Sequence, residues 1–77
     1  MENNAIVNTR LEELLGVMDP RANVTVFEKA EDGKEVIIAS SKLYDILSGW
    51  FVNIYGSYKV IGLSVTLGVT SILIEEA

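Results

Sequence analysis

A chain of 77 residues with a net charge of −5 is long enough for one small domain. It contains no His and no Cys, which removes the commonest catalytic base, the thiolate nucleophile and the usual transition-metal ligands, so no metal or cofactor is expected. The acidic balance argues against direct nucleic-acid binding, because contact with phosphates requires a basic face.

The start of the sequence and its lack of Cys indicate where in the cell the protein is expected. Glu2 is followed by a polar, Asn-rich start, without the basic and apolar regions of a signal peptide. A secreted domain of this size usually depends on disulfides, so the lack of Cys favours a cytoplasmic protein. We expect residues 1–8 to form a flexible lead-in and residues 9–77 a single domain. Within the lead-in, Ala5, Ile6 and Val7 either add a short edge strand or pack beside the first helix.

The first predicted helix begins at Thr9. Thr9 and Glu12 have the spacing of a capping box, in which the hydroxyl accepts from the Glu12 N–H and the carboxylate reaches back. Apolar residues then recur with helical spacing and predict a stripe over two to three turns. The stripe consists of Leu11, Leu14, Leu15 and Met18. Asp19 and Pro20 are expected to end the helix, because proline disfavours α geometry in the residue before it.

A hairpin is predicted next. Residues 23–29 alternate as a strand does, with Val24 and Val26 on one face and Thr25 and Phe27 on the other. Asp32 and Gly33 supply the usual chemistry of a hairpin turn, and residues 34–40 return as the second strand.

The second predicted helix is capped by Ser40 or Ser41. Its apolar stripe is Leu43, Ile46, Leu47 and Trp50. Gly49 is expected to help end this helix. Residues 50–57 either continue the helix by a turn or form an irregular apolar loop before the last strands.

The last third of the chain predicts a second hairpin. Residues 60–67 alternate, Gly68 accepts the positive φ of a tight turn, and a β-branched run follows to residue 74. The rival interpretation is a membrane span. Residues 60–74 carry no charge, but this run of 15 residues is shorter than the roughly 20 that a helix needs to cross a bilayer.

Together these elements predict a two-layer α+β domain with the order α-β-β-α-β-β. Two short helices are expected on one face of a four-stranded, mainly antiparallel sheet. The residues expected to be buried together are Leu14, Val26, Ile38, Leu47, Leu63 and Val65.

Several short segments carry a resemblance to known proteins. They are residues 9–15 (TRLEELL), 18–20 (MDP), 24–27 (VTVF) and 31–33 (EDG), with the closing segment 58–74. Their order resembles that of a group of small proteins from phages and integrated mobile elements of low-GC Gram-positive bacteria. Those proteins typically run helix, break, hairpin with Asp-Gly, short helix and closing hairpin. The group has no assigned activity, so the resemblance transfers no functional residue and implies an accessory protein of a mobile element.

Four aromatic residues near the second helix are the candidate interaction site. They are Trp50, Phe51, Tyr55 and Tyr58. One interpretation is that they cover the core and its rim. The other is a partner surface, since Trp and Tyr are enriched in binding hot spots.

The sequence therefore favours a non-enzymatic interaction protein. Most of its carboxylates fall at expected helix starts, turns and termini, where a solvated role is usual. A homodimer is expected, through the aromatic residues or a sheet edge, and the alternative is a monomer that binds a foreign protein. A second functional hypothesis is an acidic inhibitor that mimics nucleic acid and blocks a host defence enzyme. Clustering of the carboxylates on one face would separate the two functions.

Overall fold

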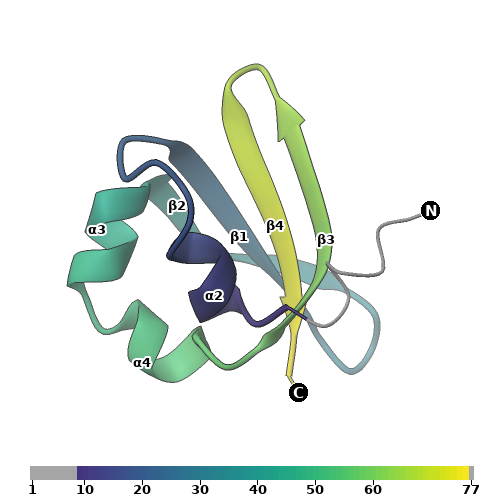
Figure 1. Cartoon of the computed structure of the whole chain (residues 1–77). Coiled ribbons are helices and arrows are strands. Elements are labelled where there is room, and N and C mark those ends of the chain that lie inside the picture. Colours follow the sequence, from purple (N-terminus) through teal and green to yellow (C-terminus); the bar gives the residue numbers. More distant parts are fainter. Residues whose placement is uncertain (1–8, 77) are drawn as a thin grey trace.

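The computed structural model describes residues 9–76, which form a four-stranded sheet and three short helices (Figure 1). The elements in chain order are α2 (Leu11–Leu15), β1 (Asn23–Lys29), β2 (Glu35–Lys42), α3 (Leu43–Ser48), α4 (Phe51–Tyr55), β3 (Lys59–Thr66) and β4 (Val69–Glu75). The α+β class is confirmed, with one helix more than expected among the described residues. The predictions for residues 1–8 lie outside this part of the chain.

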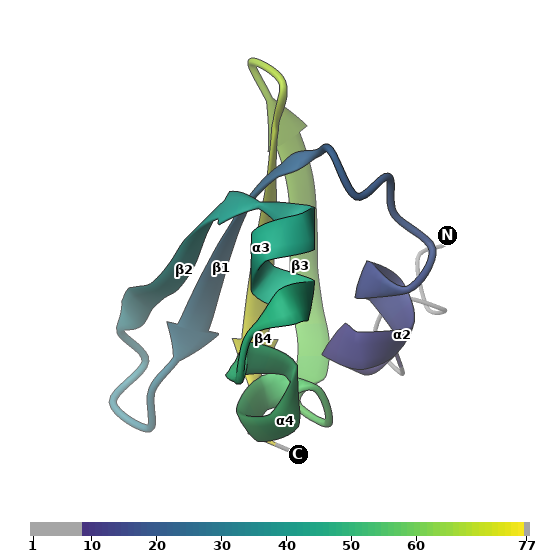
Figure 2. The ribbon, with the colours of Figure 1, turned by 90° about the vertical axis from the view of Figure 1, so that its left-hand side faces the viewer.

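The sheet is mixed rather than wholly antiparallel. Its strand order is β2-β1-β4-β3. The pairs β1–β2 and β3–β4 are antiparallel hairpins, but the central pair β1–β4 is parallel. The prediction of a mainly antiparallel sheet is therefore only partly correct. The chain crosses from β2 to β3 through α3 and α4, so β4 lies beside β1 and β3 takes the sheet edge (Figures 1 and 2).

Both predicted turns are confirmed. Gly33 has a φ of 87°, and the Lys34 N–H donates to the Asp32 carboxylate at 3.0 Å. In the second turn, Gly68 has a φ of 79° and Leu67 a φ of 53°. Positive φ at both central residues is the geometry of a two-residue type I′ turn, which matches the twist of the flanking strands. Leucine is an unusual residue there, because its side chain disfavours that conformation.

The first helix is shorter than predicted and starts one residue later. Its N-cap is Arg10, whose N–H donates to Glu13 Oε1 at 2.9 Å, so the expected box between Thr9 and Glu12 is wrong. The Glu12 N–H donates instead to the carbonyl of Gly56 at 2.8 Å. The helix ends at Leu15, ahead of the predicted stop.

The start of α3 also differs from the prediction. Its N-cap is Lys42, and neither Ser40 nor Ser41 caps it. Ser40 Oγ is hydrogen-bonded to Thr25 Oγ1 at 3.0 Å, and Ser41 Oγ donates to the Lys42 carbonyl. The loop before β1 supplies the acceptors instead. The N–H groups of Leu43 and Tyr44 donate to the carbonyls of Ala22 and Pro20, both at 2.9 Å. Backbone contacts across the fold therefore fix where α3 begins.

Gly49 ends α3, as predicted, and its backbone is extended. Residues 51–55 then form a separate helix, α4, rather than an extension of α3 or an irregular loop. The C-terminal apolar run forms the β3–β4 hairpin. None of the helices in residues 9–76 is long enough and apolar enough to span a membrane.

The core lies between the helices and one face of the sheet. Its buried members are Leu11, Leu15, Val24, Val26, Leu43, Ile46, Phe51, Val60, Ile72 and Ile74. Among the residues predicted to be buried, Val26 is buried, and Leu14 and Ile38 are half-buried against this cluster.

The prediction is wrong for Leu47, Leu63 and Val65, which are 42%, 41% and 69% exposed. On α3, the core takes Leu43 and Ile46, which leaves Leu47 on the outer side. The β3–β4 hairpin projects past the helices, so nothing among them covers that end of β3 (Figure 1).

A pair of leucine variants tests this division of α3. Leu43→Ala should lower the free energy of unfolding by about 2–5 kcal/mol, because it leaves a cavity in the core. Leu47→Ala should cost less than about 1 kcal/mol, because that side chain is partly in solvent. Urea denaturation followed by circular dichroism measures both. Equal losses for the two variants would contradict the assignment.

Candidate functional site

The four predicted aromatic residues lie in one row. The ring centroids of Trp50 and Phe51 are 6.1 Å apart, those of Phe51 and Tyr55 4.9 Å, and those of Tyr55 and Tyr58 5.0 Å. The last pair meets edge to face, a favoured arrangement for aromatic rings. The structure thus brings together all four residues, from α4 and its two flanking turns.

The row does not form one exposed surface. Phe51 is 5% exposed and belongs to the core, while Trp50 is 63% exposed. Tyr55 and Tyr58 are half-buried and pack against the core cluster. Phe51 therefore supports the fold, and Trp50 is the member of the row best placed to contact another molecule.

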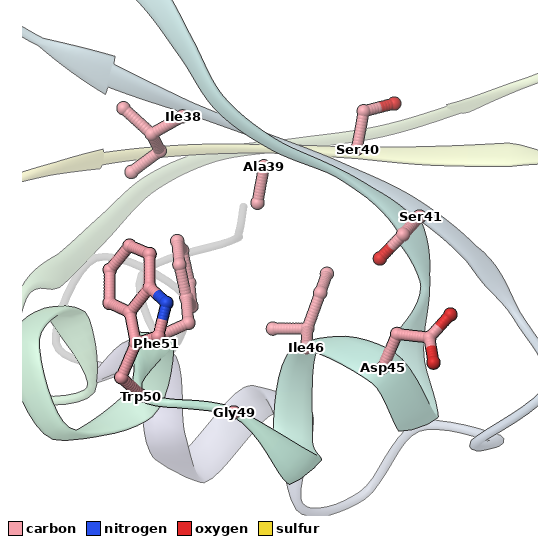
Figure 3. Close-up of a pocket in the computed structure, with 9 residues that line it drawn as sticks. All are labelled: Ile38, Ala39, Ser40, Ser41, Asp45, Ile46, Gly49, Trp50 and Phe51. Atoms are coloured by element: carbon pink, nitrogen blue, oxygen red, sulfur yellow. The ribbon is translucent and has the colours of Figure 1, made fainter.

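Trp50 stands at the mouth of a groove between β2 and the two helices α3 and α4 (Figure 3). The groove has a volume of about 240 Å³. It is lined by Ile38, Ala39, Ser40, Ser41, Asp45, Ile46, Gly49, Trp50 and Phe51. The side chains of Ala39, Ile46 and Phe51 point toward its interior, and Ser41 and Asp45 lie at the end away from Trp50 (Figure 3). The groove is thus apolar at one end and polar at the other.

Local features of the sequence open this groove. The register between β1 and β2 shifts at Ile38, which is the extra residue of a bulge. Two lining residues leave space in the groove: Ala39 has a small side chain, and Gly49, at the turn between the helices, has none. The sequence indicates Trp50 and Phe51 but not the side of the groove that β2 forms, because a bulge leaves no clear mark in the alternation of a strand.

A second feature lies at the end of the sheet where β1 and β4 finish. Parallel pairing brings their carboxyl ends together, and a shallow surface there is lined by Lys29, Ala30, Glu31, Glu75 and Glu76. Lys59 Nζ lies 4.0 Å from Glu75 Oε2. Acidic residues from separate parts of the sequence therefore meet at this end, but with lysines among them.

The negative charge at this end of the sheet affects the pKa of Tyr58. Partial burial raises the pKa of the Tyr58 hydroxyl above its ordinary value of 10.0, and the negative charges of Glu28 and Glu76 raise it further. Tyr55 adds to the same effect. Each cause disfavours the phenolate, so the hydroxyl stays protonated to higher pH in the folded chain.

Within residues 9–76, no polar or charged side chain is buried. In the same residues, no three acidic side chains gather as ligands for a metal ion. Comparison of the chain with protein-family models, with curated proteins and with solved structures finds no match in any of the three.

The raised pKa of Tyr58 predicts an alkaline loss of stability. The folded chain holds this proton more tightly than the unfolded chain, so stability is intact below pH 10 and falls as the pH rises through the higher, folded-state pKa. Tyr58→Phe has no such proton and should lessen the fall in the urea midpoint between about pH 9 and about pH 11. Tyr44→Phe, at an exposed position of α3, is the matched control. An equal fall in Tyr58→Phe and in the parent chain would contradict this assignment.

Proposed function

We propose that this chain is a non-enzymatic protein-interaction protein that binds its partner through the groove beside Trp50. The observation that carries the proposal is a tryptophan 63% exposed at the apolar end of a groove. Trp is among the residues that dominate binding hot spots, and such anchors act by filling a well-packed pocket. An apolar side chain of the partner, laid against Trp50 and Ile46, fits this surface.

The surroundings of the groove support the same proposal. Tyr44 and Leu47 on α3, and Ile54 on α4, are also exposed. These large side chains add exposed surface to the two short helices. A partner that covered the groove could extend over the part of this surface on α3 and remove it from water.

We further propose that the chain is an accessory protein of a phage or mobile element and acts in the cytoplasm. The resemblance in segments 9–15, 18–20, 24–27, 31–33 and 58–74 supports the origin. The absence of Cys supports the location. The lack of His and Cys also supports a role without catalysis.

A pair of variants tests the binding site. Trp50→Ser should abolish capture of the partner from host lysate by the tagged chain, because the anchor of the site is lost. Ile54→Ser is the matched control, since Ile54 on α4 is also exposed, at 54%, but does not line the groove. Mass spectrometry identifies the proteins that the parent chain retains, and circular dichroism checks that both variants are folded.

Trp50 is the only tryptophan of the chain, so its fluorescence gives a second reading. Addition of the captured protein should shift the emission to the blue as the indole leaves water. Retention of the same proteins by Trp50→Ser, or loss of them in Ile54→Ser alone, would place the interface elsewhere.

The acidic end of the sheet favours a second candidate function, an inhibitor that mimics nucleic acid and blocks a host defence enzyme. The carboxylates at this end are Glu28, Glu31, Asp32, Glu35, Glu75 and Glu76. Lys29, Lys34 and Lys59 lie among the same strand ends and offset part of their charge, so we rank this function second. It predicts binding that weakens with salt and is lost in a Glu31→Gln, Glu76→Gln double variant but kept in Trp50→Ser.

A further inference from the structure

The outer edge of β3 is partly occupied and partly open among the residues that the structure describes. Residues 9–11 run along its beginning. The Leu11 N–H donates to the Tyr58 carbonyl, and the Val60 N–H donates to the Thr9 carbonyl, both at 2.9 Å. Beyond Val60, no described strand pairs with this edge, because β3 is the last strand of the sheet. The open edge therefore consists of residues 62–66, after the bulge at Ile61.

The hairpin geometry shows which backbone groups point outward along the open edge. Leu67 and Gly68 form a two-residue turn, so Thr66 and Val69 are the hydrogen-bonded pair that closes it. Hydrogen-bonded and non-hydrogen-bonded pairs alternate along an antiparallel ladder. Ser64 therefore directs its N–H and C=O toward β4, while Leu63 and Val65 direct theirs away from the sheet.

The side chains along this edge are apolar and uncharged. Leu63 and Val65 pair with Ile72 and Thr70 and lie on the helix-facing side of the sheet, yet they are 41% and 69% exposed. Residues 60–74 carry no charge at all. Natural edge strands are usually protected by charged residues, prolines or bulges against pairing with other chains. Residues 62–66 have none of these.

We propose that a second copy of the chain pairs with this edge, antiparallel and with a two-fold axis at Ser64. The open edge is bounded by Val60, which residues 9–11 cover, and by the turn after Thr66, so Ser64 is its centre. In this register Leu63 of one copy faces Val65 of the other, and their outward N–H and C=O groups bond to each other. The same side chains then cover one another on the helix side of the joined sheet.

The distribution of charge allows a second copy to approach this edge. Each copy carries a net charge of −5, so two copies repel wherever their acidic residues meet. The acidic end of the sheet is formed by the last residues of β1 and β4, whereas Ser64 lies near the opposite end, close to the β3–β4 turn (Figure 1). Pairing at Ser64 brings together segments without charged side chains. It keeps the acidic ends of the two copies apart.

This dimer is independent of the proposed function. The groove beside Trp50 lies along β2, at the other edge of the sheet (Figure 2). Pairing through β3 leaves the groove open on both copies. A dimer would then present two grooves at opposite edges of the joined sheet and could bind a repeated partner with increased avidity.

A cysteine pair tests the register. At the two-fold axis, the Ser64 residues of the two copies form a non-hydrogen-bonded pair with a Cα separation of about 4.5 Å, which is within the range of a disulfide. The chain has no Cys of its own. Ser64→Cys should therefore form a covalent dimer under mild oxidation with glutathione. Thr66→Cys is the matched control and should stay unlinked, because its own counterpart lies about 13 Å away in this register.

Light scattering tests the edge itself. The parent chain should have twice the 8.4 kDa mass of one chain. Val65→Lys should halve the mass, because a charge on the edge opposes pairing. Val36→Lys makes the same change at an exposed valine of the other edge strand, β2, and should remain dimeric. Circular dichroism checks that both variants are folded.

Three outcomes would overturn the proposal. The first is a single-chain mass for the parent protein across a wide concentration range. The second is equal cross-linking of Thr66→Cys and Ser64→Cys. The third is a folded Val65→Lys variant that keeps the doubled mass.

Discussion

The parallel pairing of β1 with β4 is the contact on which the rest of the structure depends. It pairs Val26 with Ile72, and Val24 and Ile74 lie on the same face, each two residues along its own strand from that pair. These four side chains are buried under the helices. The pairing joins two hairpins that are far apart in sequence, and an isolated hairpin is only marginally stable in water. It also places β2 and β3 at opposite edges, which separates the Trp50 groove from the open edge of β3.

The helices depend on this sheet and on backbone contacts with distant loops. The described helices have five or six residues, too few to be stable alone in water. At the start of α3, the carbonyls of Pro20 and Ala22 accept from the first N–H groups. At the start of α2, the carbonyls of Gly56 and Tyr58 do the same. These two helix starts are therefore satisfied only when the remainder of the chain is folded, which makes folding cooperative.

These contacts explain which features could be predicted from the sequence. Both hairpins were predictable, because the turn chemistry at Gly33 and Gly68 is local. The helix starts were misplaced, because the acceptors come from other parts of the chain rather than from Thr9, Ser40 or Ser41. The parallel pair was missed for the same reason, since nothing in the alternation of β1 or β4 specifies its neighbour.

The candidate site also has one feature that the sequence predicts and one that it does not. The high number of aromatic residues in one short segment pointed to Trp50, Phe51, Tyr55 and Tyr58, and in the structure their rings lie in one row. The spacing of these residues in the sequence does not show that Phe51 belongs to the core while Trp50 is exposed. That difference arises because α3 ends at Gly49 and α4 starts in a new direction, which turns adjacent side chains to different surroundings.

The two edges of the sheet differ in a way that favours a closed assembly. The β2 edge has charged residues at both ends, Glu35 and Lys42, and a bulge at Ile38, features that oppose strand pairing. The β3 edge also has a bulge, at Ile61, but it lies next to the part that residues 9–11 already cover. A sheet with two open edges would grow into a filament through repeated pairing. In the proposed dimer, symmetric pairing through residues 62–66 would use this edge of both copies, and growth would end at the dimer.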